Sequence, residues 1–309
     1  MSKKFVLIYG DAFVDYIAED QSNSRFSKFL GGATVNVAAG VARLGAASSF
    51  ITVTGENETS EFVRNELISE GVDLSFSQIV PEKEVSGVYV HLLENNERHF
   101  ERYVDATPDI QVDFSSIKSE AIHQTSVFHF CSGTLFHPTA LATTRKIVES
   151  MKKSNVLISF DANIRPLRWK SEEICRETIC SFFDFVDILK LTEEELFFLT
   201  KTTTIEEGVT YLQQYNIEVL LITIGAEGTY AVINGEAVHV PVEKVIPIDT
   251  TGAGDAFVAG ILSKIYLDGH PSTKEAWIRY IAFGNKLGGI CATKSGALSA
   301  MPRLIDLQQ

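Results

Sequence analysis

The sequence is poor in cysteine and lacks any apolar stretch of membrane-spanning length. No CxxC pair occurs among its four cysteines, Cys131, Cys175, Cys180 and Cys291, which lie in strand-like or helix-like segments. We therefore expect buried free thiols, and neither disulfides nor a zinc site. A membrane-spanning helix needs about 20 consecutive apolar residues. No stretch approaches that length, so no membrane span is expected.

Positive charge is also scarce. There are 27 Lys and Arg against 40 Asp and Glu, which gives a net charge of -13. Such a surface repels phosphate backbones, so nucleic acid is not expected as a partner, although a locally positive site still allows a nucleotide substrate. The first apolar run, FVLIYG, passes directly into Asp11, which is typical of a first strand and not of a signal peptide. Together these features favour a cytoplasmic protein.

Strand-like and helix-like segments alternate from about residue 120 onward. The predicted strands are 126–130, 155–160, 185–190 and 218–224, and the predicted helices are 138–153, 171–181 and 192–200. This alternation implies right-handed crossovers and an α/β fold with a doubly wound, mostly parallel sheet that has helices on both faces. The ligand site of such a sheet lies beyond the carboxyl ends of its strands.

The first third of the chain has a different pattern. Its predicted elements are a strand at 5–10, helices at 34–44 and 60–70, and strands at 85–94 and 98–104 around a hairpin turn at 94–97. We interpret this hairpin, together with residues 12–30, as a small β-sheet lid. No repeat or long linker occurs, so one domain over 1–309 with an inserted lid fits better than two independent domains.

The segment DTTGAGDAFVAG, Asp249 to Gly260, carries the strongest functional signal. Its small residues Gly252, Ala253 and Gly254 precede a helical pattern, so exposed backbone amides at a helix N-terminus are expected to bind phosphate. A loop that only binds phosphate would avoid the carboxylate of Asp255. That carboxylate indicates a base that takes a proton from an attacking hydroxyl. The alternative is an acidic residue that merely favours the first helical turn.

This segment resembles the second signature of the ribokinase-like (PfkB) carbohydrate kinase family. GGATVNVAAGVARLG at 31–45 resembles the first signature, and the two lie in the family's order. The resemblance covers essentially the whole chain. It implies a ribokinase-like α/β domain with a β-lid over the sugar, and phosphoryl transfer from MgATP to a sugar or nucleoside hydroxyl.

The resemblance also implies roles for individual residues around the acceptor. Asp255 matches the catalytic base, and Gly252, Ala253 and Gly254 match the anion hole that stabilises the transferring phosphoryl group. The residues that match sugar contacts are Asp15, Gly31, Gly32 and Asn36, with Asp11 as a further candidate. Adjacent glycines let the backbone approach a polyol closely. A plain loop before a helix is the alternative for the two glycines.

Two further segments, ITIGAEGTYAV at 222–232 and LKLTEEEL at 189–196, resemble the nucleotide side of the family's site. From these segments and the late helical region, the expected ATP-binding residues are Lys190, Thr192, Thr223, Gly225, Gly228 and Asn285. Core polar packing is the alternative for Asn285. LKLTEEEL at 189–196 resembles an Asn-x-x-Glu motif near magnesium, of which only Glu195 is retained, with an indirect role. Thr192-x-x-Glu195 is equally a helix capping box.

TKSGALSAMP at 293–302 resembles the family loop that encloses adenine and a monovalent cation. The implied cation ligands are Asp249, Thr251 and the carbonyls of Cys291, Lys294 and Gly296. Hard oxygen ligands suit potassium. Ala300 stands where ribokinases offer a serine.

The acceptor is expected to be fructose. FDANIRPLRW at 160–169 most resembles the fructokinase branch, although Ala162 replaces that branch's usual proline. Arg165 is expected near the acceptor, with a surface salt bridge as the alternative. Arg102 resembles a lid arginine that the family aims at the sugar, which leaves 2-keto-3-deoxygluconate as second choice. Ala33, where ribokinases have lysine, argues against ribose.

Two other classes of protein remain open. A sugar-binding regulator that lost catalysis is disfavoured by the retained Asp255. A dinucleotide-binding oxidoreductase is disfavoured because GDAFVD, and not GxGxxG, follows the first strand. Edge strands of the lid allow two copies to pair, so a homodimer is a candidate assembly.

Overall fold

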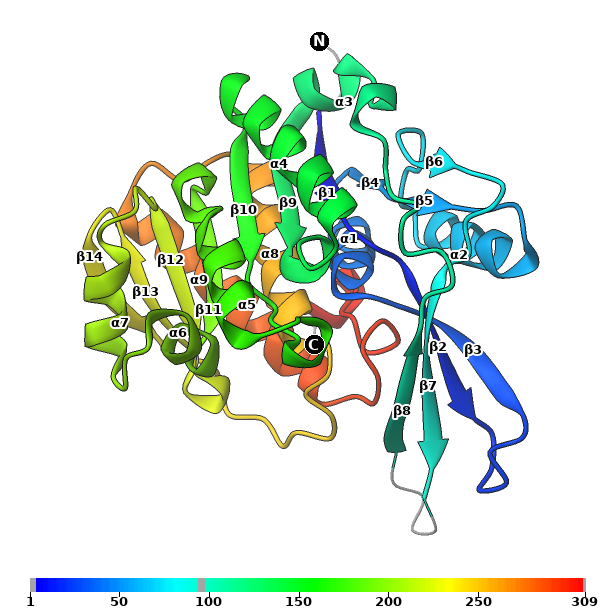
Figure 1. Ribbon diagram of the computed structural model, residues 1–309. Helices are drawn as coiled ribbons and strands as arrows, with labels where there is room; N and C mark the ends of the chain where they lie inside the picture. The colour runs from blue at the N-terminus through cyan, green and yellow to red at the C-terminus, as the bar shows by residue number, and fades with distance from the viewer. Residues whose placement is uncertain (1–3, 94–97, 308–309) are drawn as a thin grey trace.

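A sheet of eight strands forms the centre of the molecule, in the order β14-β13-β12-β11-β10-β9-β1-β4 (Figure 1). The computed structural model describes residues 4–93 and 98–307. The strands of this sheet are β1 (Phe5–Tyr9), β4 (Ser48–Ile51), β9 (Thr125–Cys131), β10 (Leu157–Asp161), β11 (Ile188–Thr192), β12 (Val219–Thr223), β13 (Thr229–Ile233) and β14 (Glu236–Val240). All neighbours from β4 to β12 are parallel, whereas β13 and β14 run antiparallel at the edge. The prediction of a mostly parallel sheet is therefore confirmed.

Helices cover both faces of this sheet. They are α1 (Ala33–Arg43), α2 (Glu58–Ser69), α3 (Ser119–His123), α4 (Pro138–Lys153), α5 (Glu172–Cys180), α6 (Glu193–Thr200), α7 (Ile205–Leu212), α8 (Ala253–Asp268) and α9 (Lys274–Ala292). In β1 successive side chains point to opposite faces, as the pleat of a strand requires. Val6 and Ile8 join one core with α1, α2, α8 and α9, whereas Leu7 and Tyr9 join the other with α3 to α7. This confirms the doubly wound arrangement.

A second, four-stranded sheet projects from the main body (Figure 1). Its strands, in the order β3-β2-β7-β8, are β2 (Phe13–Ala18), β3 (Phe26–Gly31), β7 (Ser86–Leu92) and β8 (Arg98–Val104). The central pair β2–β7 is parallel and the two outer pairs are antiparallel. The predicted turn at 94–97 lies outside the described residues. A minor sheet pairs β5 (Val53–Thr54) with β6 (Gln78–Ile79).

The strand predicted at 185–190 begins later than expected, at Ile188. Residues Phe183–Phe185 form a 3-10 turn instead. The side chain of Asp187 then accepts a hydrogen bond from the backbone N–H of Ile158 at 2.8 Å. An aspartate that bonds the neighbouring strand in this way marks the start of the strand, which an apolar pattern does not reveal.

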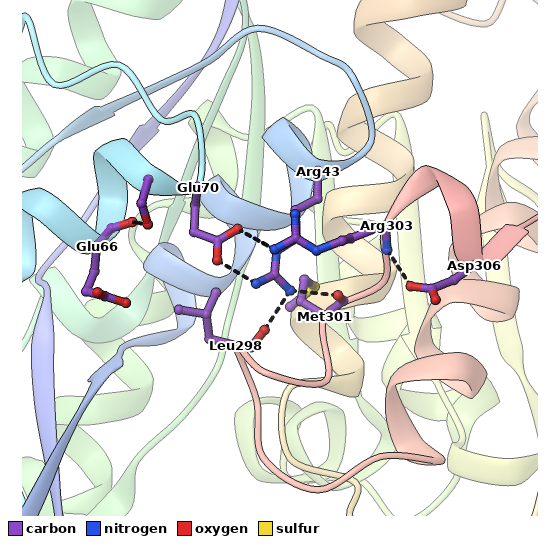
Figure 2. A network of polar contacts seen from close by, with 8 residues as sticks. Arg43, Glu66, Glu70, Leu298, Met301, Arg303 and Asp306 are labelled. Carbon is purple, nitrogen blue, oxygen red and sulfur yellow. Dashed lines mark hydrogen bonds and ion pairs between the residues drawn. The ribbon is translucent and has the colours of Figure 1, made fainter.

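The C-terminal segment is tied to α1 and α2 by the side chain of Arg43 (Figure 2). Its guanidinium donates two hydrogen bonds of 2.6 Å to the carboxylate of Glu70, and two more to the carbonyls of Leu298 and Met301 at 2.8 and 2.7 Å. Arg43 is almost fully buried and Glu70 mostly so. The loop between α9 and the chain's last turn is therefore held in place by a buried ion pair in which Arg43 donates four hydrogen bonds.

The cysteines are free thiols, as expected, but Cys180 is only partly buried. The other three thiols are buried. Within the described residues, no group of three or more His, Cys, Asp and Glu side chains is arranged to hold a metal ion. Nor does any helix in that part of the chain have the length and apolar character to cross a membrane.

Candidate active site

Two cavities open at the carboxyl edge of the large sheet, where the first turn of α8 also lies. The larger has a volume of about 680 Å³ and the smaller about 330 Å³. Ala253 and Gly254 line the larger cavity, whereas Gly252 and Asp255 line the smaller one. The first turn of α8 therefore lies between two binding spaces and faces both.

The backbone at this turn requires glycine at position 252. Gly252 has a φ of 81° in the left-handed region, and a Cβ atom there would lie 2.9 Å from Cα of Ala297. At the start of this 16-residue helix the N–H of Ala253 donates to the carbonyl of Thr250 at 3.1 Å, whereas the amides of Gly254 and Asp255 have no helical partner. Such amides and the helix dipole together attract an anion.

Asp255 is buried in the first turn of α8, with 8% of its surface exposed. The side-chain amide of Asn36 donates a hydrogen bond of 2.8 Å to its Oδ2 atom. Burial raises the pKa of Asp255 to about 7; Asn36 opposes this shift and the nearby carboxylate of Asp161 adds to it. A carboxylate with a pKa near neutrality is suited to accept a proton from a hydroxyl group.

A buried ion pair supplies positive charge beside this turn. The Lys190 ammonium lies 3.1 and 3.2 Å from the two carboxylate oxygens of Asp161. Burial disfavours the charge on Lys190, but the carboxylates of Asp161 and Glu195 prevail and raise its pKa. The ammonium also lies close to Gly254, since a Cβ there would be 3.2 Å away. Lys190 is thus a charged group aimed at the anion-binding turn.

The smaller cavity gathers nearly all of the predicted acceptor contacts. It is lined by Asp11, Asp15, Gly31, Gly32, Asn36 and Arg165, together with Thr251, Gly252 and Asp255. Position 31 requires glycine for steric reasons, because a Cβ there would lie 2.5 Å from Oδ2 of Asp15 on the adjacent strand. Burial raises the pKa of Asp11, while Arg168 acts against this shift.

Arg102 is the exception, because it does not line this cavity. Its guanidinium lies 4.7 Å from the ring centroid of Tyr89, and its neighbour Tyr103 lines the cavity instead. Successive side chains of a strand point to opposite faces, so the residue next to an inward-facing tyrosine points outward. The structure thus brings Tyr103, and not Arg102, to the other predicted acceptor contacts.

Sequence reasoning also missed a second arginine in the cavity. Arg168 lines it with Phe13, Tyr103 and Phe136, which come from three separate parts of the chain. The segment FDANIRPLRW contains both Arg165 and Arg168, but nothing in its pattern separates their roles. The aromatic residues around Arg168 become neighbours only in the folded protein.

All six predicted nucleotide contacts line the larger cavity: Lys190, Thr192, Thr223, Gly225, Gly228 and Asn285. Apolar walls come from Val242, Val245 and Phe257. Asn285 is however engaged in the core, where its Oδ1 accepts from Thr229 at 2.7 Å and its Nδ2 donates to the carbonyl of Val240 at 2.8 Å. Both ends of its amide are therefore hydrogen-bonded within the protein, which agrees with the polar-packing alternative.

The capping-box interpretation of Thr192 and Glu195 is confirmed. The Thr192 side chain accepts from the Glu195 backbone N–H, and the Glu195 carboxylate accepts from the Thr192 N–H at 2.8 Å. Its second carboxylate oxygen accepts from the N–H of Ile164 at 2.7 Å. Glu195 thus joins β11 to the turn after β10, with one backbone hydrogen bond to each of its carboxylate oxygens.

The predicted cation ligands lie together beside the anion-binding turn. Asp249 accepts hydrogen bonds from the backbone and hydroxyl of Thr251 at 2.9 and 2.6 Å, and from the N–H of Gly296 at 2.9 Å. The Cys291 carbonyl accepts from the N–H of Lys294 at 3.1 Å, and its thiol faces the Thr251 carbonyl at 3.7 Å. This cluster of oxygen atoms has the chemistry that a monovalent cation requires.

Comparison with known proteins agrees with this geometry. The family model described as "pfkB family carbohydrate kinase" matches residues 3–304 of this chain. A fructokinase from Klebsiella pneumoniae is 33% identical over 305 residues, which are 98% of each chain. A Vibrio cholerae fructokinase variant, solved with fructose, ADP and potassium, has a TM-score of 0.88 at 30% identity and covers 99% of this chain and 98% of its own. A Xylella fastidiosa fructokinase with bound ATP has a TM-score of 0.89 at 25% identity, covering 99% and 97%.

Proposed function

Because the chain belongs to the pfkB family of carbohydrate kinases, we propose that it transfers the γ-phosphoryl group of MgATP to a hydroxyl of fructose. One observation carries this proposal: the first turn of α8 lies between two cavities and presents small residues to one and Asp255 to the other. The fructokinases found by both comparisons support the choice of reaction and of acceptor.

The nucleotide occupies the larger cavity in this mechanism. Lys190 and the backbone amide of Gly254, beside Ala253, stabilise the charge that develops on the transferring group. Asp255 faces the acceptor in the other cavity and takes the proton of the attacking hydroxyl as general base. Gly252 permits the backbone turn that brings these groups together.

Two ions accompany the proposed reaction. Magnesium would be held by the nucleotide phosphates and water, and would offset the charge of the phosphates. Glu195 keeps an indirect role in this proposal, because its carboxylate is held by the backbone N–H groups of Thr192 and Ile164. Potassium fits the oxygen atoms of Asp249, Thr251 and the neighbouring carbonyls, where it would support the loop behind Gly252. Its chemical contribution is to offset negative charge beside the anion-binding turn.

A neutral sugar suits the charges of the smaller cavity. Its carboxylates, Asp11, Asp15 and Asp255, outnumber its two arginines, Arg165 and Arg168. A further carboxylate on the acceptor would add repulsion, which disfavours 2-keto-3-deoxygluconate. Sugar hydroxyls both donate and accept hydrogen bonds, so a polyol can pair with carboxylates and arginines at once.

We propose that the small sheet acts as a lid over this acceptor. Phe13, Asp15, Gly31, Val88 and Tyr103 belong to its strands and line the smaller cavity. Closure over the sugar would exclude water and so suppress hydrolysis of the nucleotide.

A coupled assay of ADP release tests the proposed function. The purified chain is offered MgATP with fructose, 2-keto-3-deoxygluconate, ribose or adenosine, with Asp255→Asn as a matched control. Fructose should give the highest kcat/KM. A higher value with 2-keto-3-deoxygluconate would replace fructose as the acceptor, and no release with any of the four would favour a sugar-binding protein without catalysis.

A further inference from the structure

Arg168 enters the acceptor cavity through a cage of aromatic rings. It closes the 3-10 turn Pro166–Arg168, which follows β10. Its guanidinium carbon lies 3.8 Å from the ring centroid of Phe136 and 5.0 Å from those of Phe13 and Tyr103. Contacts of this kind bind a cation through the faces of the rings.

The rings come from both sides of the cavity. Phe13 and Tyr103 belong to strands of the small sheet, whereas Phe136 belongs to the main body, as does Arg168. A guanidinium stacked by its faces keeps its N–H groups free in its own plane. Stacking therefore fixes the direction of Arg168 without using its hydrogen-bond donors.

These donors have no acceptor in the part of the chain that the structure describes. No described carboxylate lies within 4.0 Å of the guanidinium, and no described oxygen accepts a hydrogen bond from it; only the backbone N–H of Arg168 is bonded, to the carbonyl of Arg165. The side chain of Arg168 is only partly buried, so water can reach its five donors, and a ligand that replaces this water must offer acceptors in its place. Since Arg168 lines the smaller cavity, the ligand that can do so is the acceptor.

The two arginines of the cavity act on different carboxylates. Burial raises the pKa of both Asp255 and Asp11. At Asp255 this shift is opposed first by Asn36 and only last by Arg165, whereas at Asp11 it is opposed most strongly by Arg168. The charge of Arg168 therefore acts on Asp11, which lines the same cavity.

We propose that Arg168 is the specificity-determining residue of the acceptor site, and that its caged guanidinium donates hydrogen bonds to hydroxyl oxygens of a neutral sugar beside Asp11. The inference rests on the proposed function in that the acceptor is a sugar. It assigns to the main body, through Arg168, the recognition that the sequence placed on the lid through Arg102. Asp11 accepts from the sugar while Arg168 donates to it, which fixes the orientation of the substrate.

The test compares Arg168→Met with Arg102→Met. Methionine keeps a long apolar side chain among the rings but removes the charge and all donors. The matched control removes an arginine that also stacks on a ring, Tyr89, but lies outside the cavity. Fructose binding is measured by calorimetry in the presence of a non-hydrolysable ATP analogue, and KM is measured for both substrates.

We expect Arg168→Met to raise the fructose Kd and KM by roughly 10- to 100-fold, as for lost hydrogen bonds from a charged donor. The KM for ATP should stay within about twofold, and Arg102→Met should leave all three constants near their original values. Should Arg168→Met not fold, Arg168→Lys retains the charge but not the planar fork, and the same weakening of fructose binding is expected.

Binding of monodeoxy-fructoses separates recognition from a structural role. If Arg168 donates to a hydroxyl, removal of that hydroxyl should weaken binding to the unmodified protein but not to Arg168→Met. Unchanged fructose affinity in Arg168→Met, with only a lower Tm, would overturn the proposal and leave Arg168 as a structural contact between lid and main body. An unmodified protein that prefers another sugar in the ADP-release assay would refute fructose as acceptor; Arg168 would then be judged by its effect on the Kd of that sugar.

Discussion

At the scale of single residues, Asp255 links burial to catalysis through its pKa. Only the deprotonated carboxylate can accept the proton of the attacking hydroxyl, and burial raises its pKa to about 7. We therefore expect kcat/KM for fructose to be constant above pH 8 and to fall about tenfold per unit below pH 7. Steady-state rates between pH 5.5 and 9, at fixed ionic strength, measure this profile.

Asp255→Asn provides the control for that profile. Turnover should fall roughly 10²- to 10⁴-fold, and the remaining rate should lose its dependence on pH near 7. Because the folded-state pKa is raised, the folded protein binds this proton more tightly than the unfolded chain, so the stability that the proton contributes is lost as pH rises through 7. The variant should therefore melt at pH 8 no lower than the unmodified protein. Near-normal turnover, or an unaltered pH profile, would exclude Asp255 as the base.

The residues that sequence reasoning located around Asp255 share one property. Gly252, Ala253, Gly254 and Asp255 are consecutive, so their spacing alone brings them to one turn. Asn36 was assigned through a second continuous motif, and it contacts Asp255 across 219 positions. Arg168 belongs to no such motif, and its cage depends on three distant aromatic side chains. A contact of that kind is set by the tertiary fold and has no local signal.

At the scale of elements, the interpretation of β8 shows why strand positions are hard to predict. The pairing of β7 and β8 shifts between Tyr89 and Val90, so the alternation of faces is interrupted along the strands. A shift of one residue moves a side chain to the other face. The strands themselves were predicted from their β-branched and aromatic residues, but the face that Arg102 and Tyr103 present depends on pairing, which the sequence of one strand does not contain.

The cluster of Arg43, Glu70 and Arg303 joins α1 and α2 to the C-terminal segment, and its loss should lower the stability of the protein (Figure 2). Arg43→Ala would leave the mostly buried carboxylate of Glu70 and the carbonyls of Leu298 and Met301 without their partner. Since removing one member of a buried ion pair leaves an uncompensated charge, we expect the free energy of unfolding to fall by about 3 kcal/mol. Urea denaturation followed by circular dichroism measures this loss.

Arg303→Ala is the matched control within the same cluster. Arg303 also approaches Glu70, at 3.3 Å, but its side chain is 56% exposed. Exposed pairs contribute about 0–1 kcal/mol, so this variant should be nearly as stable as the unmodified protein. The loop that Arg43 fixes also packs Ala297 against Gly252 and bonds Gly296 to Asp249. Because Ala297 lines the smaller cavity, Arg43→Ala should also raise the KM for fructose. Equal stability of the two variants would contradict the role of the cluster.

At the scale of the whole molecule, the two cavities are lined by residues from different parts of the chain. All residues that line the larger cavity lie between Lys190 and Ala292, on the main body. The smaller cavity combines residues from the small sheet with residues that follow β9 and β10. A sugar in the smaller cavity would therefore bridge two bodies of structure, whereas a nucleotide in the larger one would contact only one.

This difference predicts which ligand protects the small sheet from hydrogen exchange. Fructose should slow exchange in peptides that cover β2 and β3, because a ligand that contacts both Asp15 and the main body opposes opening of the sheet. A non-hydrolysable ATP analogue alone should protect peptides around Thr223 and Gly254 and leave the small sheet nearly unchanged. Asp15→Ala is the matched variant: it removes an acceptor from the cavity without changing the nucleotide side, so fructose at the same concentration should protect its small sheet less. Equal exchange of β2 and β3 with and without fructose, at a concentration that saturates turnover, would show that the sheet does not close over the sugar. Phosphoryl transfer at the first turn of α8 would be untouched by that result, because its residues belong to the main body alone.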